Sequence, residues 1–208
     1  MTKREVSALD QPLEIDDQFL NIQTQSIIYW GSEQPMHYES EPTSYSILQY
    51  LLDYLTISSQ DVLVDFGCGT GRVLCFMNYQ LNLVVRGVES HPTTLKLLKQ
   101  NTSDYFKAHP NQPPIELYPV SAQDYLMQAD ETLYYFFNPF ALPIFKQVVR
   151  NIEKSIEQFP RTVRLICYYP YHFKKFLETE SIFEPVQEIT VPTGDWTDYF
   201  IIYQNKER

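Results

Sequence analysis

Residues 62–74 read Val-Leu-Val-Asp-Phe-Gly-Cys-Gly-Thr-Gly-Arg-Val-Leu, and this stretch decides the fold. An apolar run reaches Asp65 and passes into a loop with glycine at every second position. Because glycine lacks a Cβ, such a loop can turn with positive φ and bring backbone amides close to a ligand. A helix that starts near Gly71 points its free amides at the same place, which favours a bound carboxylate or phosphate. The stretch therefore predicts a strand, a ligand-binding loop and a helix.

The spacing of the three glycines distinguishes two classes of cofactor. A dinucleotide-binding loop follows the pattern G-x-G-x-x-G. Here Gly67, Gly69 and Gly71 come at equal intervals, and Arg72 occupies the third glycine position of that pattern. The segment instead resembles the first motif of the class I S-adenosylmethionine (SAM) dependent methyltransferases, in which a strand leads into Asp-x-Gly-x-Gly-x-Gly; Asp65 and the three glycines match it. The resemblance implies that the loop and Asp65 hold the amino-acid end of SAM.

A second acid ends the next predicted strand, which covers residues 83–89 and closes on Glu89. In a parallel, doubly wound sheet the carboxyl ends of neighbouring strands meet at the ligand crevice, so Glu89 is expected beside the glycine loop. A carboxylate there can accept hydrogen bonds from both hydroxyls of a ribose, and the resemblance assigns Glu89 this role. The alternative is that Glu89 caps the helix that begins around Pro92.

The third predicted strand, residues 115–118, leads into a turn that contains Asp124. In the resembling family a turn at this place commonly supplies an acid that bonds the adenine amino group, and Asp124 matches the place loosely. The alternative is a solvated surface turn.

The fourth predicted strand, residues 132–137, is apolar almost throughout, as expected of a buried parallel strand. It ends on Asn138-Pro139-Phe140. In the resembling family the end of this strand faces the reactive methyl group, and Asn/Asp-Pro-Pro-aromatic motifs there hold an amino group for attack; the second Pro is missing here. Asn138 could accept a hydrogen bond from the methyl acceptor, and Phe140 could stack on a flat or cationic group. We therefore expect both as catalytic residues, with Asn138 also beside the cofactor; a turn that only ends the strand is the alternative.

The remaining periodicity completes an α/β architecture. Apolar residues at helical spacing predict helices over 43–55, 92–109 and 142–159, and short apolar runs predict a fifth strand over 163–169 and a terminal hairpin over 183–190 and 199–203. Together with the resemblance, these elements predict a doubly wound, Rossmann-like, mostly parallel seven-stranded sheet with an antiparallel C-terminal hairpin.

The chain is expected to divide near residue 42. Residues 1–42 are predicted to form an N-terminal leader, flexible or loosely docked up to about residue 25, and a small helical cover. The segment 27–39 is rich in aromatics, and by the family resemblance Trp30 or Tyr38 would help to shape the acceptor site. Residues 43–208 are predicted to form the SAM-binding domain.

The composition of the chain limits the classes of methyl acceptor and the cellular location that we expect. The 208 residues carry 16 Lys and Arg against 26 Asp and Glu, a net charge of -10. Since nucleic-acid binding draws most of its affinity from basic side chains, an RNA or DNA acceptor is disfavoured and a small molecule or a protein is expected. No run of about 18 apolar residues and no signal-like start is present, so a soluble, cytoplasmic protein without membrane contact is expected.

The three cysteines, Cys68, Cys75 and Cys167, lack metal-like spacing, and no metal is expected. Cys68 lies inside the loop and counts among its cofactor-binding residues by position. No base is placed near it by sequence, so a small loop residue is favoured over a nucleophile.

The sequence therefore predicts a SAM-dependent methyltransferase with an unidentified acceptor. Three alternatives stay open: a catalytically silent SAM-binding protein, a protein-lysine methyltransferase, and a nicotinamide-dependent oxidoreductase. The glycine spacing and the terminal hairpin count against the last of these.

Overall fold

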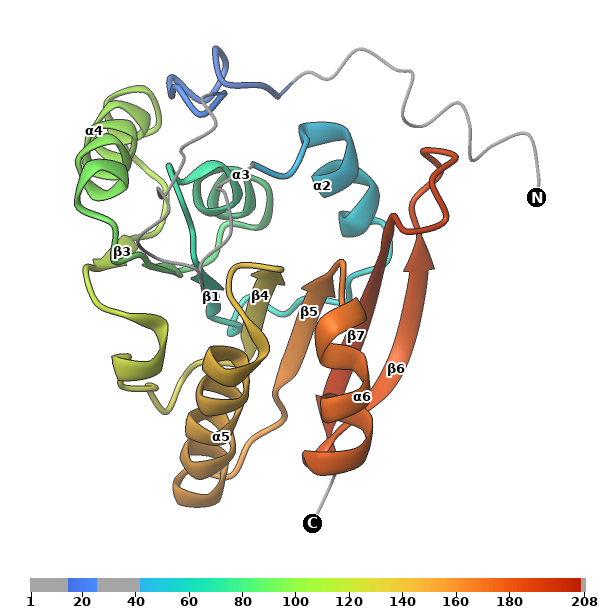
Figure 1. The fold of residues 1–208 in the computed structure, drawn as a ribbon. Coiled ribbons are helices and arrows are strands. Elements are labelled where there is room, and N and C mark those ends of the chain that lie inside the picture. The colour runs from blue at the N-terminus through green and yellow to red at the C-terminus, as the bar shows by residue number, and fades with distance from the viewer. Residues whose placement is uncertain (1–14, 26–41, 207–208) are drawn as a thin grey trace.

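The computed structural model describes residues 15–25 and 42–206, which build one seven-stranded sheet covered by helices (Figure 1). The expected helical cover, with Trp30 and Tyr38, lies outside the described residues. The helices are α2 (Tyr45–Leu52), α3 (Arg72–Leu81), α4 (Pro92–Ala108), α5 (Leu142–Gln158) and α6 (Tyr171–Glu180), with a short 3-10 turn η1 (Ala122–Asp124). The strands are β1 (Leu63–Phe66), β2 (Val85–Val88), β3 (Ile115–Tyr118), β4 (Leu133–Phe137), β5 (Arg164–Tyr168), β6 (Phe183–Thr190) and β7 (Tyr199–Asn205).

The sheet has the order β3-β2-β1-β4-β5-β7-β6, which confirms the predicted seven-stranded, mostly parallel arrangement. Strands β1 to β5 pair in parallel, whereas β7 lies antiparallel between β5 and β6. From β1 the chain adds β2 and β3 on one side and then returns to add β4 on the other. The carboxyl ends of β1 and β4 therefore flank the switch point at which doubly wound sheets bind their ligands.

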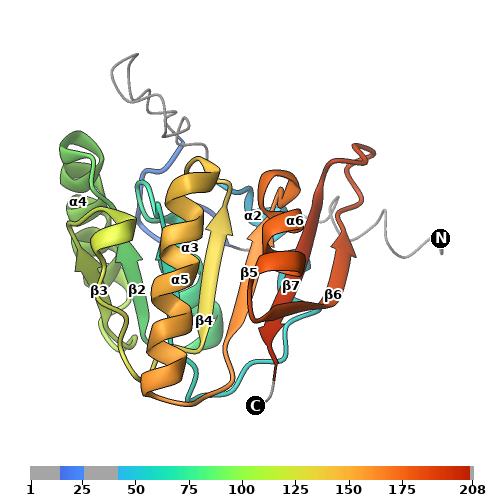
Figure 2. The ribbon, with the colours of Figure 1, turned by 60° about the horizontal axis from the view of Figure 1, so that its bottom comes forward.

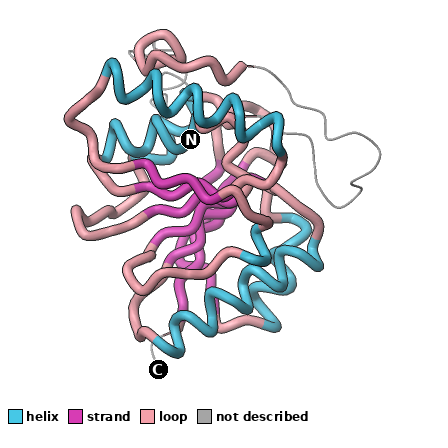
Figure 3. The backbone as a smooth tube through the Cα atoms, turned by 90° about the vertical axis from the view of Figure 1, so that its left-hand side faces the viewer, coloured by secondary structure: helices cyan, strands magenta, loops and turns pink. Residues whose placement is uncertain are grey.

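Helices cover both faces of the sheet, as the edge-on view shows (Figure 3). Helices α5 and α6 lie on one face and α2 and α3 on the other (Figure 2). Because both faces are buried, all four residues of β1 are buried, which explains why every one of them except Asp65 is apolar. Within the part of the chain that the structure describes, no helix combines the length and the apolar character needed to cross a membrane.

Helix α5 illustrates how the sequence pattern places the helices. Its residues Ile144, Val148, Ile152 and Ile156 recur every fourth position, and all four are buried against the sheet. Pro143 lies in the first turn, where a missing backbone N–H disturbs no helical hydrogen bond.

Residues 15–25 are folded against α3 and α4, although a flexible or loosely docked leader was the expectation for this part of the chain. Leu20 and Ile22 are buried in the core. The side chain of Asn101 on α4 accepts a hydrogen bond from the Gln23 amide and donates one to the Gln23 carbonyl, each over 3.0 Å. Two apolar side chains give no detectable periodicity, so only the tertiary partners reveal this docking.

Candidate functional site

The glycine loop between β1 and α3 has the backbone that its sequence predicts. Gly67, Gly69 and Gly71 have φ values of 74°, 55° and 96°, in the region that side chains disfavour. The Gly67 amide donates to the carbonyl of Val88 over 2.9 Å, which ties the loop to the end of β2. A Cβ on Gly67 would lie 2.7 Å from the Cβ of Pro139, so glycine is required for the loop to pack against the end of β4.

Glu89 lies beside the loop, as predicted, and is only 3% exposed. Its Oε2 accepts a hydrogen bond from the Gly69 amide over 3.2 Å, and its Oε1 accepts from the amides of Ser90 and His91 over 2.7 and 2.8 Å. The carboxylate therefore also holds the turn into α4, while His91 is the residue at the N-cap position of that helix. Each carboxylate oxygen has two lone pairs, so Oε2 can accept a further donor such as a ribose hydroxyl.

Asp65 lies on β1 between Gly87 and Tyr135 of the neighbouring strands. Burial first, and the negative charge of Glu89 second, raise the pKa of its carboxyl to about 8. Among the described residues it receives no hydrogen bond, and a bound cation would reverse the pKa shift. Asp65 is therefore a buried acid whose ordinary charge is disfavoured in the ligand-free protein.

A cavity of about 40 Å³ lies between Asp65 and the loop. This volume suits a carboxylate, an ammonium group or a water molecule, and a whole nucleoside needs several times more. Its described lining comprises Pro42, Thr43, Asp65, Gly67, Cys68, Gly69, Thr70, Arg72, Val73, Tyr135 and Phe137.

Cys68 contributes backbone to the loop, and its side chain belongs to the core. A Cβ on Gly87 would come within 2.9 Å of the Cys68 Sγ, so the thiol packs directly over β2. Burial, and then the charges of Asp65 and Glu89, raise the pKa of the thiol well above its usual value. Because the thiolate is the reactive form, a nucleophilic role is disfavoured here.

Asn138 ends β4 in a left-handed conformation, with φ at 39°. Its Oδ1 atom is buried and has no hydrogen-bond partner among the described residues. The next residue, Pro139, is the one that packs on Gly67. The structure thus brings Asn138 to the glycine loop with an unused acceptor, and buried polar atoms of this kind call for an explanation.

Phe140 lies in the hydrophobic core and not beside the glycine loop. It is 2% exposed, and its ring packs edge to face on Phe136 at 6.4 Å, within the apolar cluster beneath α5. The structure therefore accounts for Phe140 as a core residue and does not place its ring in the cavity lining. The chain enters α5 two residues later, and the apolar face of that helix draws the ring into the core.

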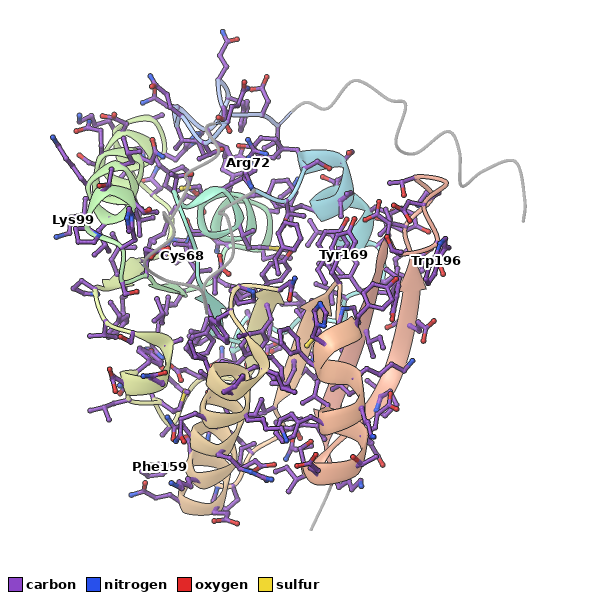
Figure 4. The ribbon with its side chains drawn as sticks, viewed as in Figure 1. Cys68, Arg72, Lys99, Phe159, Tyr169 and Trp196 are labelled. Atoms are coloured by element: carbon purple, nitrogen blue, oxygen red, sulfur yellow. The ribbon has the colours of Figure 1, made fainter. Side chains whose placement is uncertain are left out.

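An aromatic residue that sequence reasoning missed, Tyr169, lies at the matching place on the next strand. Phe137 and Tyr168 are register partners, so Asn138 and Tyr169 follow them side by side, and both have positive φ, 39° and 52°. The ring of Tyr169 stacks on Phe137 at 5.8 Å, and Figure 4 shows it above the ends of β4 and β5. Such strained residues gather at functional sites. Tyr169 precedes Pro170, but that pattern favours extended backbone, so no local signal in the sequence indicates its positive φ.

Asp124 lies on η1, with an exposed side chain. The neighbouring carbonyl of Gln123 accepts a hydrogen bond from Asn151 of α5 over 2.9 Å, so the turn rests on that helix. No contact among the described residues joins Asp124 to the glycine loop, and its adenine role stays a prediction.

The fold is similar to solved structures of methyltransferases. An RNA methyltransferase from Salinibacter ruber, in complex with S-adenosyl-L-homocysteine, matches with a TM-score of 0.58 and 17% identity, over 81% of this chain and 95% of that one. The glycopeptide N-methyltransferase MtfA, in complex with SAM, matches with a TM-score of 0.59 and 8% identity, over 77% and 86%. A segment of StiE O-MT matches with a TM-score of 0.57 and 13% identity, over 78% and 73%.

No family model matches the sequence, and no curated protein matches it. At these identities the structural likeness establishes the fold. The chain has the class I SAM-dependent methyltransferase fold that the glycine motif implied.

Proposed function

We propose that the protein is a SAM-dependent methyltransferase. The observation that carries the proposal is the pairing of a three-glycine, left-handed loop with two buried acids, Asp65 and Glu89, at the switch point of this sheet. Two similar structures, the Salinibacter ruber enzyme and MtfA, were solved with S-adenosylhomocysteine or SAM. This supports SAM as the cofactor.

The residues fit that cofactor on two observations. Gly67, Gly69 and Gly71 all have positive φ and carry no Cβ, so no side chain of these three residues covers the loop backbone. Asp65 is a buried carboxyl that lines the cavity beside the loop and receives no hydrogen bond from the described residues. We assign the amino-acid end to Asp65 and the loop, the ribose to Glu89 and the adenine to Asp124, within a domain of residues 43–208.

The side chains have little covalent chemistry to perform. When bound, SAM supplies an electrophilic methyl group for an in-line displacement. The chain must therefore orient the acceptor and exclude water. Asn138 would accept a hydrogen bond from the acceptor's N–H or O–H, which directs the attacking lone pair, while the aromatic rings of Phe137 and Tyr169 would line a site that suits a sulfonium cation.

Three classes of acceptor are compatible with this proposal. The net charge disfavours nucleic acid, whereas the structures of similar fold include an enzyme named as an RNA methyltransferase. The acceptor is thus a small molecule, a protein or an RNA.

Calorimetric titration with S-adenosylhomocysteine and, separately, with NAD⁺ tests the cofactor. We expect binding of the first and none of the second; binding of NAD⁺ alone would establish the oxidoreductase alternative. Incubation with tritiated SAM and panels of small molecules, peptides and RNA then separates an enzyme from a silent SAM-binding protein, because only the enzyme transfers the label.

A further inference from the structure

Arg72 is a buried cation beside the glycine loop that the assignment above does not use. It is the first residue of α3, is 8% exposed, and lines the same small cavity as Asp65 and Thr43. Figure 4 shows it between α3 and the segment 15–25. A buried guanidinium needs partners for its charge and for its five N–H donors.

Part of that requirement is met by residues 15–25 and by the start of α2. The Arg72 Nε donates to Thr24 Oγ1 over 2.7 Å and lies 3.6 Å from Asp17 Oδ1. Its Nη1 donates to the Thr43 carbonyl over 3.3 Å, and its Cζ lies 4.7 Å from the centre of the Tyr45 ring.

The second amino group, Nη2, has no hydrogen-bond acceptor within residues 15–25 and 42–206. Asp17 accepts hydrogen bonds from Thr24 and Tyr45, and it meets the guanidinium through the 3.6 Å ion pair with Nε. An oxygen-rich anion in the cavity would complete the set of partners, and the free amides at the start of α3 favour the same charge.

Asp65 also lines the cavity and restricts what the ligand can be. An ammonium group beside it would stabilise the charged carboxylate, whereas a phosphate dianion would not. A ligand with an ammonium group toward Asp65 and a carboxylate toward Arg72 satisfies both side chains at once. That combination is an α-amino acid.

We propose that Arg72 binds the carboxylate of the amino-acid end of SAM, while Asp17 and Thr24 hold its guanidinium in place. The inference rests on the proposed function and adds a residue to its site. It also makes residues 15–25 the back wall of the cofactor site, since they position the side chain that contacts the ligand.

The test compares SAM with decarboxylated SAM, which lacks only the carboxylate, by calorimetric titration. Wild-type protein should prefer SAM by about 10- to 100-fold, the range for a charged hydrogen bond. In Arg72→Gln the two affinities should become nearly equal, because only the contact with the carboxylate is lost. Arg72→Lys should keep part of the preference, since lysine retains the charge without the planar fork.

Lys99→Gln is the matched control. Lys99 is an exposed cation on α4 (Figure 4), and its loss should leave the preference for SAM unchanged. Asp17→Asn tests the positioning role: the affinity for SAM should fall while that for decarboxylated SAM holds.

Two results would overturn the role of Arg72. Equal binding of both ligands by wild-type protein overturns the inference even if Arg72→Gln fails to fold, and so does an unchanged preference in a folded Arg72→Gln variant. If wild-type protein binds neither ligand, the proposed function fails and not the role of Arg72 alone.

Discussion

The backbone amide of Gly69 donates a hydrogen bond to Oε2 of Glu89 over 3.2 Å, so the loop and the end of β2 are held as one unit. Glu89 also accepts from the amides of Ser90 and His91. Glu89→Ala would leave these buried donors without a partner, at a cost of about 1–3 kcal/mol for each that water does not reach. A loss of stability should therefore accompany the loss of cofactor affinity.

Glu89→Gln separates the two effects. The amide keeps one oxygen as an acceptor, so urea denaturation should show a smaller loss of stability than for Glu89→Ala. The affinity for S-adenosylhomocysteine should fall in both variants, because the amide nitrogen cannot accept from a ribose hydroxyl. Full affinity in Glu89→Gln would remove the ribose role.

Gly67→Ala should destabilise the protein by about 1–2 kcal/mol more than Gly194→Ala. Both glycines have positive φ, 74° and 86°, so both alanines carry backbone strain. Only the Cβ at Gly67 meets another group, Pro139 at 2.7 Å, whereas the Cβ at Gly194 meets nothing within 4 Å. Chemical denaturation measures the difference, and equal losses would mean that the loop does not depend on Pro139.

The stability of the ligand-free protein should depend on Asp65 through pH. The pKa of its carboxyl is about 8 in the folded protein and about 4 in an unfolded chain. Between these values the folded protein holds a proton that the unfolded chain has released, so this group's contribution falls as pH rises, by at most about 1.4 kcal/mol per pH unit. Asp65→Asn should therefore gain stability relative to wild type between pH 5 and 8. Parallel pH profiles for the two proteins would contradict the shift.

The same proton should leave when the cofactor binds. An ammonium group beside Asp65 favours the charged carboxylate and lowers its pKa. Titration of S-adenosylhomocysteine at pH 7, in buffers with different ionisation enthalpies, should then reveal proton release in wild-type protein and less in Asp65→Asn. Affinity should rise from pH 6 to pH 8.

Asn138→Gly should preserve the fold and the cofactor affinity while abolishing methyl transfer. Glycine accepts the φ of 39° without strain and removes the unpartnered Oδ1, so the midpoint of thermal unfolding should hold or rise slightly. Transfer of label from tritiated SAM, to any acceptor that the wild-type protein methylates, is the readout. Undiminished transfer would assign Asn138 to the turn alone.

The sequence predicted the sheet and the loop because each depends on local patterns. Apolar runs, glycine spacing and terminal acids specify β1, β2 and the turn between β1 and α3, and parallel pairing then brings Asp65 and Glu89 together. The position of Asn138 near the loop could be predicted in the same way, because Asn138 ends β4 and β4 pairs with β1.

The remaining features depend on contacts across long stretches of chain. Phe140 and Phe137 are equally aromatic, and only the packing of α5 decides that Phe140 enters the core while Phe137 lines the cavity. The position of Arg72 served in the sequence only to exclude a dinucleotide-binding pattern. Its partners Asp17 and Thr24 lie far upstream in the sequence. No local pattern connects those positions.

The place of β7 in the sheet affects how the protein is made. Although β7 (Tyr199–Asn205) follows every other described strand along the chain, it lies inside the sheet, between β5 and β6. During synthesis, which proceeds from the N-terminus, β5 therefore keeps an unpaired edge and β6 has no neighbour until residue 205 has emerged. An edge of this kind can pair with other chains. The ribosome-bound nascent chain should thus be the form of this protein most dependent on chaperones.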